Sequence, residues 1–277
     1  MAHIEPLLVT MTVRNYLPFW WCFKRVNLWD RLVIRNYNHE DAHQIAKEFF
    51  LEHGNYTHFI FMTEDTTPTI THVSQIIDDV AKLEEEYGEV VVAGYSNIDF
   101  AHDDVNISFR NMANLVVSGR EVYKHPKIDD IIAGKHGWPL VRVWFQGNTL
   151  ACYPRSVVEK LSFKPYRRHR ETDTERYFGY KGRHGMMFDF QMCKELYQLG
   201  IPIFVDLRVV LMHFKTRLGT FKFATRPRFV KLVRAFDNKV VTIREDPPYA
   251  EEEKKAPEPI EDRRRWFEEK FLGIKRR

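Results

Sequence analysis

The stretch from His58 to Pro68 constrains the fold of this chain more than any other segment. Its first five residues, His58–Met62, predict a short buried strand, and two adjacent carboxylates, Glu64 and Asp65, follow before a Thr-Thr-Pro turn. Open α/β sheets bind ligands and metals at the carboxyl ends of their strands. The segment therefore predicts a ligand site at this strand end. The alternative is that the two acids only solvate the strand end or cap the helix that follows.

Strands and helices alternate on both sides of this segment. Apolar, β-rich runs predict strands at 7–13, 32–34 and 90–94, and apolar residues at helical spacing predict helices at 17–26, 39–51 and 69–87. This β-α-β-α-β-α-β order predicts an α/β fold with a mainly parallel sheet, flanked by helices and joined by right-handed crossovers. Later in the chain, strands are predicted at 140–145, 202–206 and 209–213, and helices at 155–161 and 186–196.

The composition suits one large domain with an appended segment. The chain has 277 residues, of which 44% are hydrophobic, so it can bury a substantial core. We expect an α/β domain over residues 1–220 and a basic, aromatic C-terminal extension over 221–277. A charged, proline-bearing linker at 246–259 and an amphipathic helix at 263–274 are predicted within this extension.

Charge and cysteine content exclude several classes of protein. The net charge of +4 is too small to indicate nucleic-acid binding by itself. Three cysteines lack the spacing of a metal site and fit reduced core residues. No apolar run approaches the ~20 residues of a membrane span, and the first residues do not resemble a signal peptide. We therefore expect a cytoplasmic protein. Peripheral contact with a membrane surface through the C-terminal extension is left open, because aromatic and basic residues interleave there.

The segment from Lys164 to Arg183 differs from the rest of the chain. It is rich in arginine and tyrosine and has little apolar periodicity. Two interpretations are open, a solvated loop and a mobile basic lid over an anionic ligand.

Five segments in order carry a resemblance to a known family. They are the first strand followed by Arg14-Asn15, the second strand ending in Arg35-Asn36, Phe61-Met62-Thr63-Glu64-Asp65, Gly147-Asn148-Thr149 followed by Arg155-Ser156-Val157, and Phe188-Asp189-Phe190 followed by Gly200, Asp206 and His213. Over residues 7–214 the chain resembles the GT-A-fold glycosyltransferases, typified by family 2 enzymes that use nucleotide-diphosphate sugars. The resemblance implies a Rossmann-like GT-A domain.

The chain departs from the family pattern at two positions. The first aspartate of the family's DxD motif falls at Thr63, and the glutamate of its ED pair falls at Phe188. The motif is therefore degenerate, with Glu64 and Asp65 remaining, and Asp189 is left as the one carboxylate for the role of base.

The resemblance also implies roles for individual residues. Asp65 and His213 would bind a divalent metal, Mn²⁺ or Mg²⁺, and Asp189 would be the catalytic base. The residues implied in nucleotide-sugar binding are Thr10, Arg14, Arg35, Asn36, Glu64, Gly147 and Asn148. Two structural alternatives stay open: His213 as a core histidine bonded to a backbone carbonyl, and Asp189 as a helix N-cap.

The function implied is metal-dependent transfer of a sugar from a nucleotide-diphosphate sugar to an acceptor hydroxyl, with inversion preferred because one base suffices for in-line attack. The alternative is a non-catalytic protein that binds nucleotide sugars or nucleic acid. Nucleic acid is not expected as a ligand, because the sequence contains no recognised nucleic-acid-binding motif.

Overall fold

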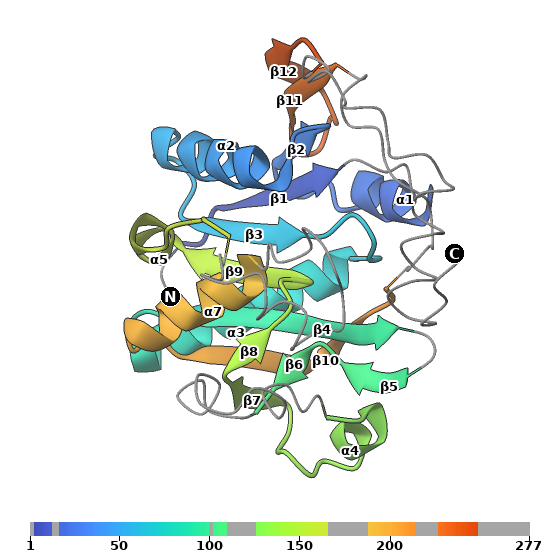
Figure 1. The fold of residues 1–277 in the computed structure, drawn as a ribbon, viewed down its shortest axis with the longest axis vertical. Coiled ribbons are helices and arrows are strands. Elements are labelled where there is room, and N and C mark those ends of the chain that lie inside the picture. Colours follow the sequence, from blue (N-terminus) through green and yellow to red (C-terminus); the bar gives the residue numbers. More distant parts are fainter. Residues whose placement is uncertain are drawn as a thin grey trace, which may run out of the picture.

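A computed structural model describes residues 3–12, 17–99, 102–109, 126–165, 188–213 and 227–248. The structure is α/β, with one large mixed sheet flanked by helices (Figure 1). The main strands are β1 (Pro6–Thr12), β2 (Arg31–Arg35), β3 (His58–Met62), β4 (Val91–Asp99), β7 (Leu140–Val143), β9 (Leu150–Pro154), β10 (Ile203–Leu211), β11 (Arg228–Val233) and β12 (Val240–Asp246). The shorter strands are β5 (His102–Val105), β6 (Ile107–Ser108) and β8 (Phe145–Gln146). The helices are α1 (Leu17–Arg25), α2 (His39–Glu52), α3 (Ile70–Tyr87), α4 (Ile128–Ile132), α5 (Arg155–Lys160) and α7 (Phe188–Gln198).

The strand order across the sheet is β12-β11-β2-β1-β3-β9-β4-β10-β7, and β5 pairs with the end of β4. The pairs β1–β2, β1–β3 and β4–β10 are parallel. Strands β9, β7 and β11 pair antiparallel with their neighbours. The α/β class predicted from the sequence is confirmed, and the sheet is mixed because these later strands enter it in the reverse direction.

The chain passes from β1 through α1 to β2 on one side, and then through α2 to β3 on the other side of β1. Right-handed crossovers of this kind place successive helices on opposite faces of the sheet. The two cores agree with that rule. One contains the buried residues of α2, α5 and α7, and the other contains those of α1 and α3. The strand order therefore reverses beside β1, and the carboxyl ends of β1 and β3 form a topological switch point.

Most predicted elements in the first hundred residues lie within a few positions of those observed, and later elements differ more. The two strands expected at 202–206 and 209–213 are one strand, β10, with a register shift between Val205 and Val210. The strand expected at 140–145 is divided at Trp144 into β7 and β8. The helix after β3 is capped by the side chain of Thr69 and ends at Gly88, whose φ of 75° lies in the left-handed region that favours glycine.

The β11–β12 hairpin continues the sheet beyond β2 (Figure 1). Residues 221–277 were expected to form an extension outside the α/β domain, yet β11 pairs antiparallel with all of β2, from Phe229 opposite Arg35 to Val233 opposite Arg31. The side chain of Arg31 is fully buried and donates to the carbonyls of Phe23 (2.8 Å) and Arg234 (3.2 Å) and to the Asn238 amide oxygen (2.6 Å). One buried guanidinium thus joins α1, β2 and the hairpin turn.

The predicted terminal helix at 263–274 lies outside the described residues. None of the helices that the structure describes combines the length and the apolar content that a bilayer span requires.

Candidate functional site

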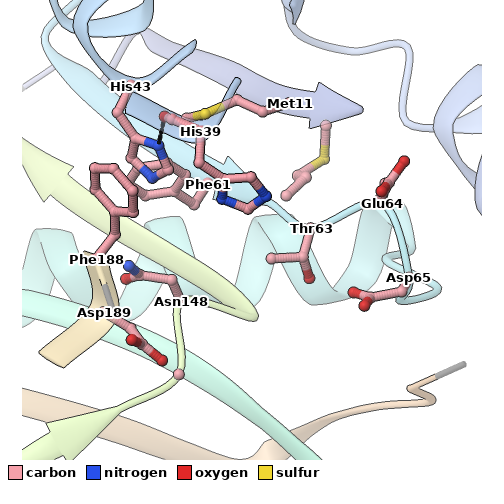
Figure 2. Close-up of a pocket in the computed structure, with 12 residues that line it drawn as sticks. Met11, His39, His43, Phe61, Thr63, Glu64, Asp65, Asn148, Phe188 and Asp189 are labelled. Atoms are coloured by element: carbon pink, nitrogen blue, oxygen red, sulfur yellow. Dashed lines mark hydrogen bonds between the residues drawn. The ribbon is translucent and has the colours of Figure 1, made fainter. Parts of the chain in front are cut away.

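A cavity of about 280 Å³ opens at the carboxyl ends of β1 and β3 (Figure 2). The first turns of α2 and α7 and the loop before β9 complete its wall. Its lining residues are Met11, His39, His43, Phe61, Met62, Thr63, Glu64, Asp65, Gly147, Asn148, Phe188 and Asp189. The cavity therefore occupies the switch point where the strand order predicts a ligand site, and it brings together five of the residues singled out from the sequence.

The lining divides into two parts. Figure 2 shows aromatic rings, imidazoles and a thioether gathered around His43 and Phe188, with the Asp189 carboxylate on the same side below Phe188 and the Glu64 and Asp65 carboxylates on the far side. Asp65 and Glu64 come from the turn after β3, and Asp189 comes from the start of α7. A ligand that fills this space would meet ring faces and the Asp189 carboxylate at one end and the carboxylates of Glu64 and Asp65 at the other.

The two adjacent acids after β3 point to different sides of their turn (Figure 2). Glu64 is mostly buried and accepts a hydrogen bond from the Thr12 hydroxyl, which ties the carboxyl ends of β1 and β3 together. Asp65 faces His213 instead, with 3.2 Å between its Oδ2 and the histidine Nε2. A β-bridge between Thr66 and His213 holds the histidine beside the turn. The pairing of Asp65 with His213, residues 148 positions apart, is the contact that the sequence resemblance anticipated.

The hydrogen bonds of His213 define its tautomer. Its Nδ1 lies 2.9 Å from the carbonyl oxygen of Asn97, which can only accept, so Nδ1 carries a hydrogen. A neutral ring then directs the Nε2 lone pair at a carboxylate oxygen of Asp65, and two acceptors face each other. Either a proton or a cation must lie between them. A carbonyl partner on the other ring nitrogen is the usual arrangement of a metal-binding histidine.

The pair fits a divalent metal that takes its other ligands from elsewhere. Neighbouring ligands of an octahedral ion at about 2.1 Å lie about 3 Å apart, close to the Nε2–Oδ2 separation of 3.2 Å. Within the described ranges, no cluster of three or more His, Cys, Asp or Glu side chains is arranged to hold a metal. A metal at Asp65 and His213 would therefore depend on ligand oxygens and water, as Mg²⁺ sites at phosphates commonly do.

Asp189 lies in the first turn of α7 and is half-buried at the cavity wall. Burial disfavours its charged form and raises the pKa of its carboxyl group to about 6, although the backbone N–H of Phe190, which donates to Oδ1 at 2.8 Å, acts in the opposite direction. The alternative role at the helix start is thus partly realised, because Asp189 does bind a first-turn amide. A carboxyl group that titrates near neutrality beside a cavity is also suited to proton transfer.

The loop before β9 is held by a buried polar network. Asn148 has a φ of 51°, in the left-handed region that asparagine tolerates. Its side-chain oxygen accepts hydrogen bonds from Gln146 Nε2 (2.6 Å) and from the Tyr153 hydroxyl, and its Nδ2 lies 3.5 Å from the sulfur of Met192. These contacts fix the Asn148 amide at the cavity wall.

Gly147 is needed for a close approach. A Cβ at this position would lie 2.5 Å from Nδ2 of Asn106, a side chain that in turn binds Thr149 and the backbone of Ser96. The small residue that the sequence resemblance marked as a binding position therefore also has a packing reason.

Three other residues assigned to nucleotide-sugar binding do not line the cavity. Thr10 is fully buried in β1, and its hydroxyl has no hydrogen-bond partner among the described residues. The Asn36 amide donates to the carbonyl of Pro227 at 2.7 Å, and the Arg35 guanidinium lies 6.0 Å from the Trp20 ring and 5.8 Å from the Phe229 ring. Arg14 and residues 166–187, most of the predicted basic lid, lie outside the described residues.

Asp206, the carboxylate that follows Gly200 in the resemblance, lies on the α3 face of the sheet. It is fully buried with Asp79, and Arg208 binds both carboxylates, at 2.8 Å from Asp206 Oδ2 and 3.2 Å from Asp79 Oδ1. Burial and the neighbouring Asp206 raise the pKa of Asp79 to about 6. Burial acts on Asp206 in the same direction, but hydrogen bonds from Arg208 outweigh it and lower its pKa. Neither carboxylate lines the cavity.

Sequence reasoning missed the two histidines of α2. His39 and His43 are one helical turn apart and both line the cavity. A usable signal was present, because a helix that starts directly after a strand with an asparagine cap, Asn38, presents its first turn at the carboxyl edge of the sheet. The pair was instead absorbed into the helical pattern of residues 39–51.

Comparisons with known proteins leave the identity of the chain open. No protein-family model matches the sequence, and no curated protein matches it. Among solved structures, A197 from STIV is similar, with a TM-score of 0.48 and 14% sequence identity over 90% of this chain and 100% of that chain.

Proposed function

We propose that this protein is a metal-dependent glycosyltransferase that moves a sugar from a nucleotide-diphosphate sugar to an acceptor hydroxyl, on a GT-A-like domain. The observation that carries the proposal is that Asp65, which is paired with His213, and Asp189 both line one switch-point cavity. The Asp65–His213 pair suits a cation beside a phosphate, and Asp189 suits removal of a proton from a hydroxyl. The proposed sugar transfer uses both.

Asp65 and His213 are the residues that would hold the metal, Mn²⁺ or Mg²⁺. When bound, such an ion neutralises the charge that develops on a departing diphosphate. The two residues contribute one negative charge and one neutral ligand, because the Asn97 carbonyl fixes the His213 hydrogen on Nδ1. Glu64 accepts a hydrogen bond from Thr12 and so joins the ends of β1 and β3 beside this pair.

Asp189 acts as the general base. Its carboxylate accepts the proton of the acceptor hydroxyl as that oxygen attacks the anomeric carbon. With a pKa raised to about 6 by burial, the group is ionised at pH 7 and still basic enough to take a proton. Gly147 and Asn148 form the wall beside it and orient the sugar.

The proposal is tested by thermal denaturation with UDP, GDP, ADP and CDP, each with and without Mn²⁺, because a ligand of the native state raises the melting temperature. We expect one nucleotide to stabilise the protein in a manner that requires Mn²⁺. The Mn²⁺-dependent rise in melting temperature should disappear in Asp65→Ala, since that variant lacks a metal ligand. The absence of any metal-dependent shift across the four nucleotides would reject the proposal.

A second candidate, a protein that binds nucleotide sugars without turnover, is favoured by one observation. No group of three or more metal-binding side chains is found among the described residues, so Asp65 and His213 would hold a metal as a pair, and Glu64 is hydrogen-bonded to Thr12. Metal-dependent binding without sugar release to water or to any acceptor would select this candidate over the transferase.

A further inference from the structure

The imidazole of His43 is built into the apolar end of the cavity. It stacks on the Phe188 ring, with centroids 3.7 Å apart and planes 7° from parallel. Phe188 stands where the family resemblance has a carboxylate, so the stacking gives that departure a structural reason. His43 is 7% exposed, and its Nδ1 lies 2.7 Å from the carbonyl oxygen of His39, one turn earlier in α2.

The hydrogen bond to the His39 carbonyl determines which nitrogen of the His43 ring can act as an acceptor. A carbonyl oxygen can only accept, so Nδ1 carries the hydrogen and Nε2 carries the lone pair. Burial lowers the pKa of His43 to about 3, which keeps the ring neutral at ordinary pH. No described residue forms a hydrogen bond with Nε2, and the side chain lines the cavity. The Nε2 lone pair is therefore available to a donor on a ligand or to water.

The charges around the cavity limit what that ligand can be. Its described lining residues include three carboxylates and no lysine or arginine. An anionic group would be repelled there unless a metal accompanied it. Asn148 adds a donor, because its amide has a second hydrogen besides the one directed at Met192, and no described residue accepts it. The cavity thus offers an acceptor on His43 and a donor on Asn148, and its described lining residues include no lysine or arginine. This combination suits hydroxyl groups, which can both donate and accept.

We propose that this cavity binds an uncharged, hydroxyl-bearing sugar ring, that Nε2 of His43 accepts a hydrogen bond from one of its hydroxyls, and that any phosphate of the ligand lies outside, toward Asp65 and His213. Identifying the hydroxyl-bearing ring as a sugar rests on the function proposed above. The recognition of an uncharged hydroxyl donor by His43 rests on the geometry alone.

The test uses ¹⁵N spectra of the histidine rings in the full-length protein. The chain offers a matched control on the same helix: His53 has its Nδ1 2.7 Å from the carbonyl of Phe49 and stacks on the Phe49 ring at 4.0 Å, far from the cavity. Methyl glycosides of glucose, mannose and N-acetylglucosamine are titrated separately, and inorganic phosphate is titrated as the anion. We expect at least one glycoside to move the Nε2 resonance of His43 and to leave that of His53 in place, and phosphate to move neither.

Variants measure the contribution of the acceptor. His43→Phe keeps a ring on Phe188 and removes the acceptor, so glycoside affinity should fall about 3- to 10-fold, as expected for one hydrogen bond. His53→Phe should not change it. Addition of UDP-glucose or GDP-mannose with Mn²⁺ identifies the source of the ring, because a donor sugar displaces the glycoside whereas an acceptor sugar remains bound beside the nucleotide.

Two outcomes would overturn the inference. One is that no glycoside moves the His43 resonance up to solubility, and the other is that phosphate moves it and the glycosides do not. The spectra that decide these two outcomes are recorded without nucleotide and without turnover, so this inference can fail while nucleotide binding with Mn²⁺ succeeds, and the reverse also holds.

Discussion

The carboxyl ends of β2 and β3 lie at the same edge of the sheet, on either side of β1, and they have opposite surroundings. The end of β3 opens into the cavity with Glu64 and Asp65. The end of β2 is covered by the C-terminal hairpin, where Asn36 binds the Pro227 carbonyl and Arg35 lies near Phe229. In sequence, both ends look alike, as an apolar run followed by polar residues. What distinguishes them is a strand that joins the sheet almost two hundred residues later.

A strand end therefore predicts a ligand site only if later parts of the chain leave it open. Variants at four positions test this difference between the two strand ends, from the largest expected effect to the smallest.

The largest effect is expected at the open end, from Asp189→Asn. Asparagine retains the hydrogen bond with the Phe190 amide but cannot take a proton, so turnover should fall by roughly 10²- to 10⁴-fold. In the wild type, activity should rise with pH through about 6, where Asp189 ionises, and this limb should be absent from the variant. Turnover across pH 5 to 8 measures both.

Stability gives an internal control for that variant. A raised carboxyl pKa in the folded state stabilises the fold below the ordinary pKa of 3.8, and this contribution is lost as the pH rises through about 6. Asp189→Asn should therefore be at least as stable as the wild type at pH 8. If turnover stays within a few-fold of the wild type, Asp189 is not the base.

The next effect concerns Asp65, at the same open end. Asp65→Ala removes one of the two side chains of the proposed metal pair. Loss of a residue that only hydrogen-bonds to a metal ligand typically costs about 10- to 100-fold in metal affinity, so the Mn²⁺-dependent affinity for the nucleotide should fall by at least that much. Calorimetric titration with and without Mn²⁺ measures the loss. Unchanged affinity would place the metal elsewhere, and the two strand ends would no longer differ in this respect.

The covered end should respond in stability rather than in binding. Asn36 has a φ of 62° and hydrogen bonds to Pro227, so Asn36→Ala should cost about 2 kcal/mol in the free energy of unfolding, from backbone strain and the lost bond together. Asn36→Gly, which tolerates the backbone angle, should cost about 1 kcal/mol less. Urea denaturation compares the two variants. A loss of nucleotide affinity in either one would return the end of β2 to the ligand site, as the resemblance implied.

The smallest effect is expected for Thr10, between the two ends. Its hydroxyl is buried without a partner in the part of the chain that the structure describes, so the isosteric Thr10→Val should leave the free energy of unfolding unchanged or raise it by up to about 1 kcal/mol. Nucleotide affinity should not change, because Thr10 does not line the cavity. A clear loss of stability would show that the hydroxyl has a partner after all.

The part of the fold that followed from the sequence is the part governed by local pattern. Strands β1, β2 and β3 are runs of buried residues, and α2 and α3 show regular apolar spacing bounded by Asn38, Thr69 and Gly88. The hairpin did not follow, because Arg228–Val233 was assigned to a basic, aromatic extension outside the domain. Its pairing with β2 and β12 joins it to the sheet, and pairing with a strand so distant in sequence as β2 leaves no trace within the segment itself.

The positions of Asp65, Asp189 and His213 followed from the sequence, because Asp65 and His213 come shortly after strands and Asp189 lies in the first turn of a helix, whereas their roles stay a prediction. The site was not predictable where the role depends on a neighbour distant in sequence. His43 becomes an acceptor only because its other nitrogen is taken by His39 and its face by Phe188. Arg35 and Asn36 were read as ligand contacts, and the segment near Pro227 that meets them was not anticipated.

Arg31 has a consequence for how the chain is made. Two of its three hydrogen-bond partners, on Arg234 and Asn238, lie 203 and 207 residues downstream. At a translation rate of about 5–20 residues per second, the ribosome needs roughly 10–40 s to supply them after Arg31 has been added. During this interval the nascent chain holds a guanidinium that cannot yet be buried, and β2 presents an unpaired edge to other nascent chains or to chaperones. Closure of that edge is therefore among the last steps of cotranslational folding.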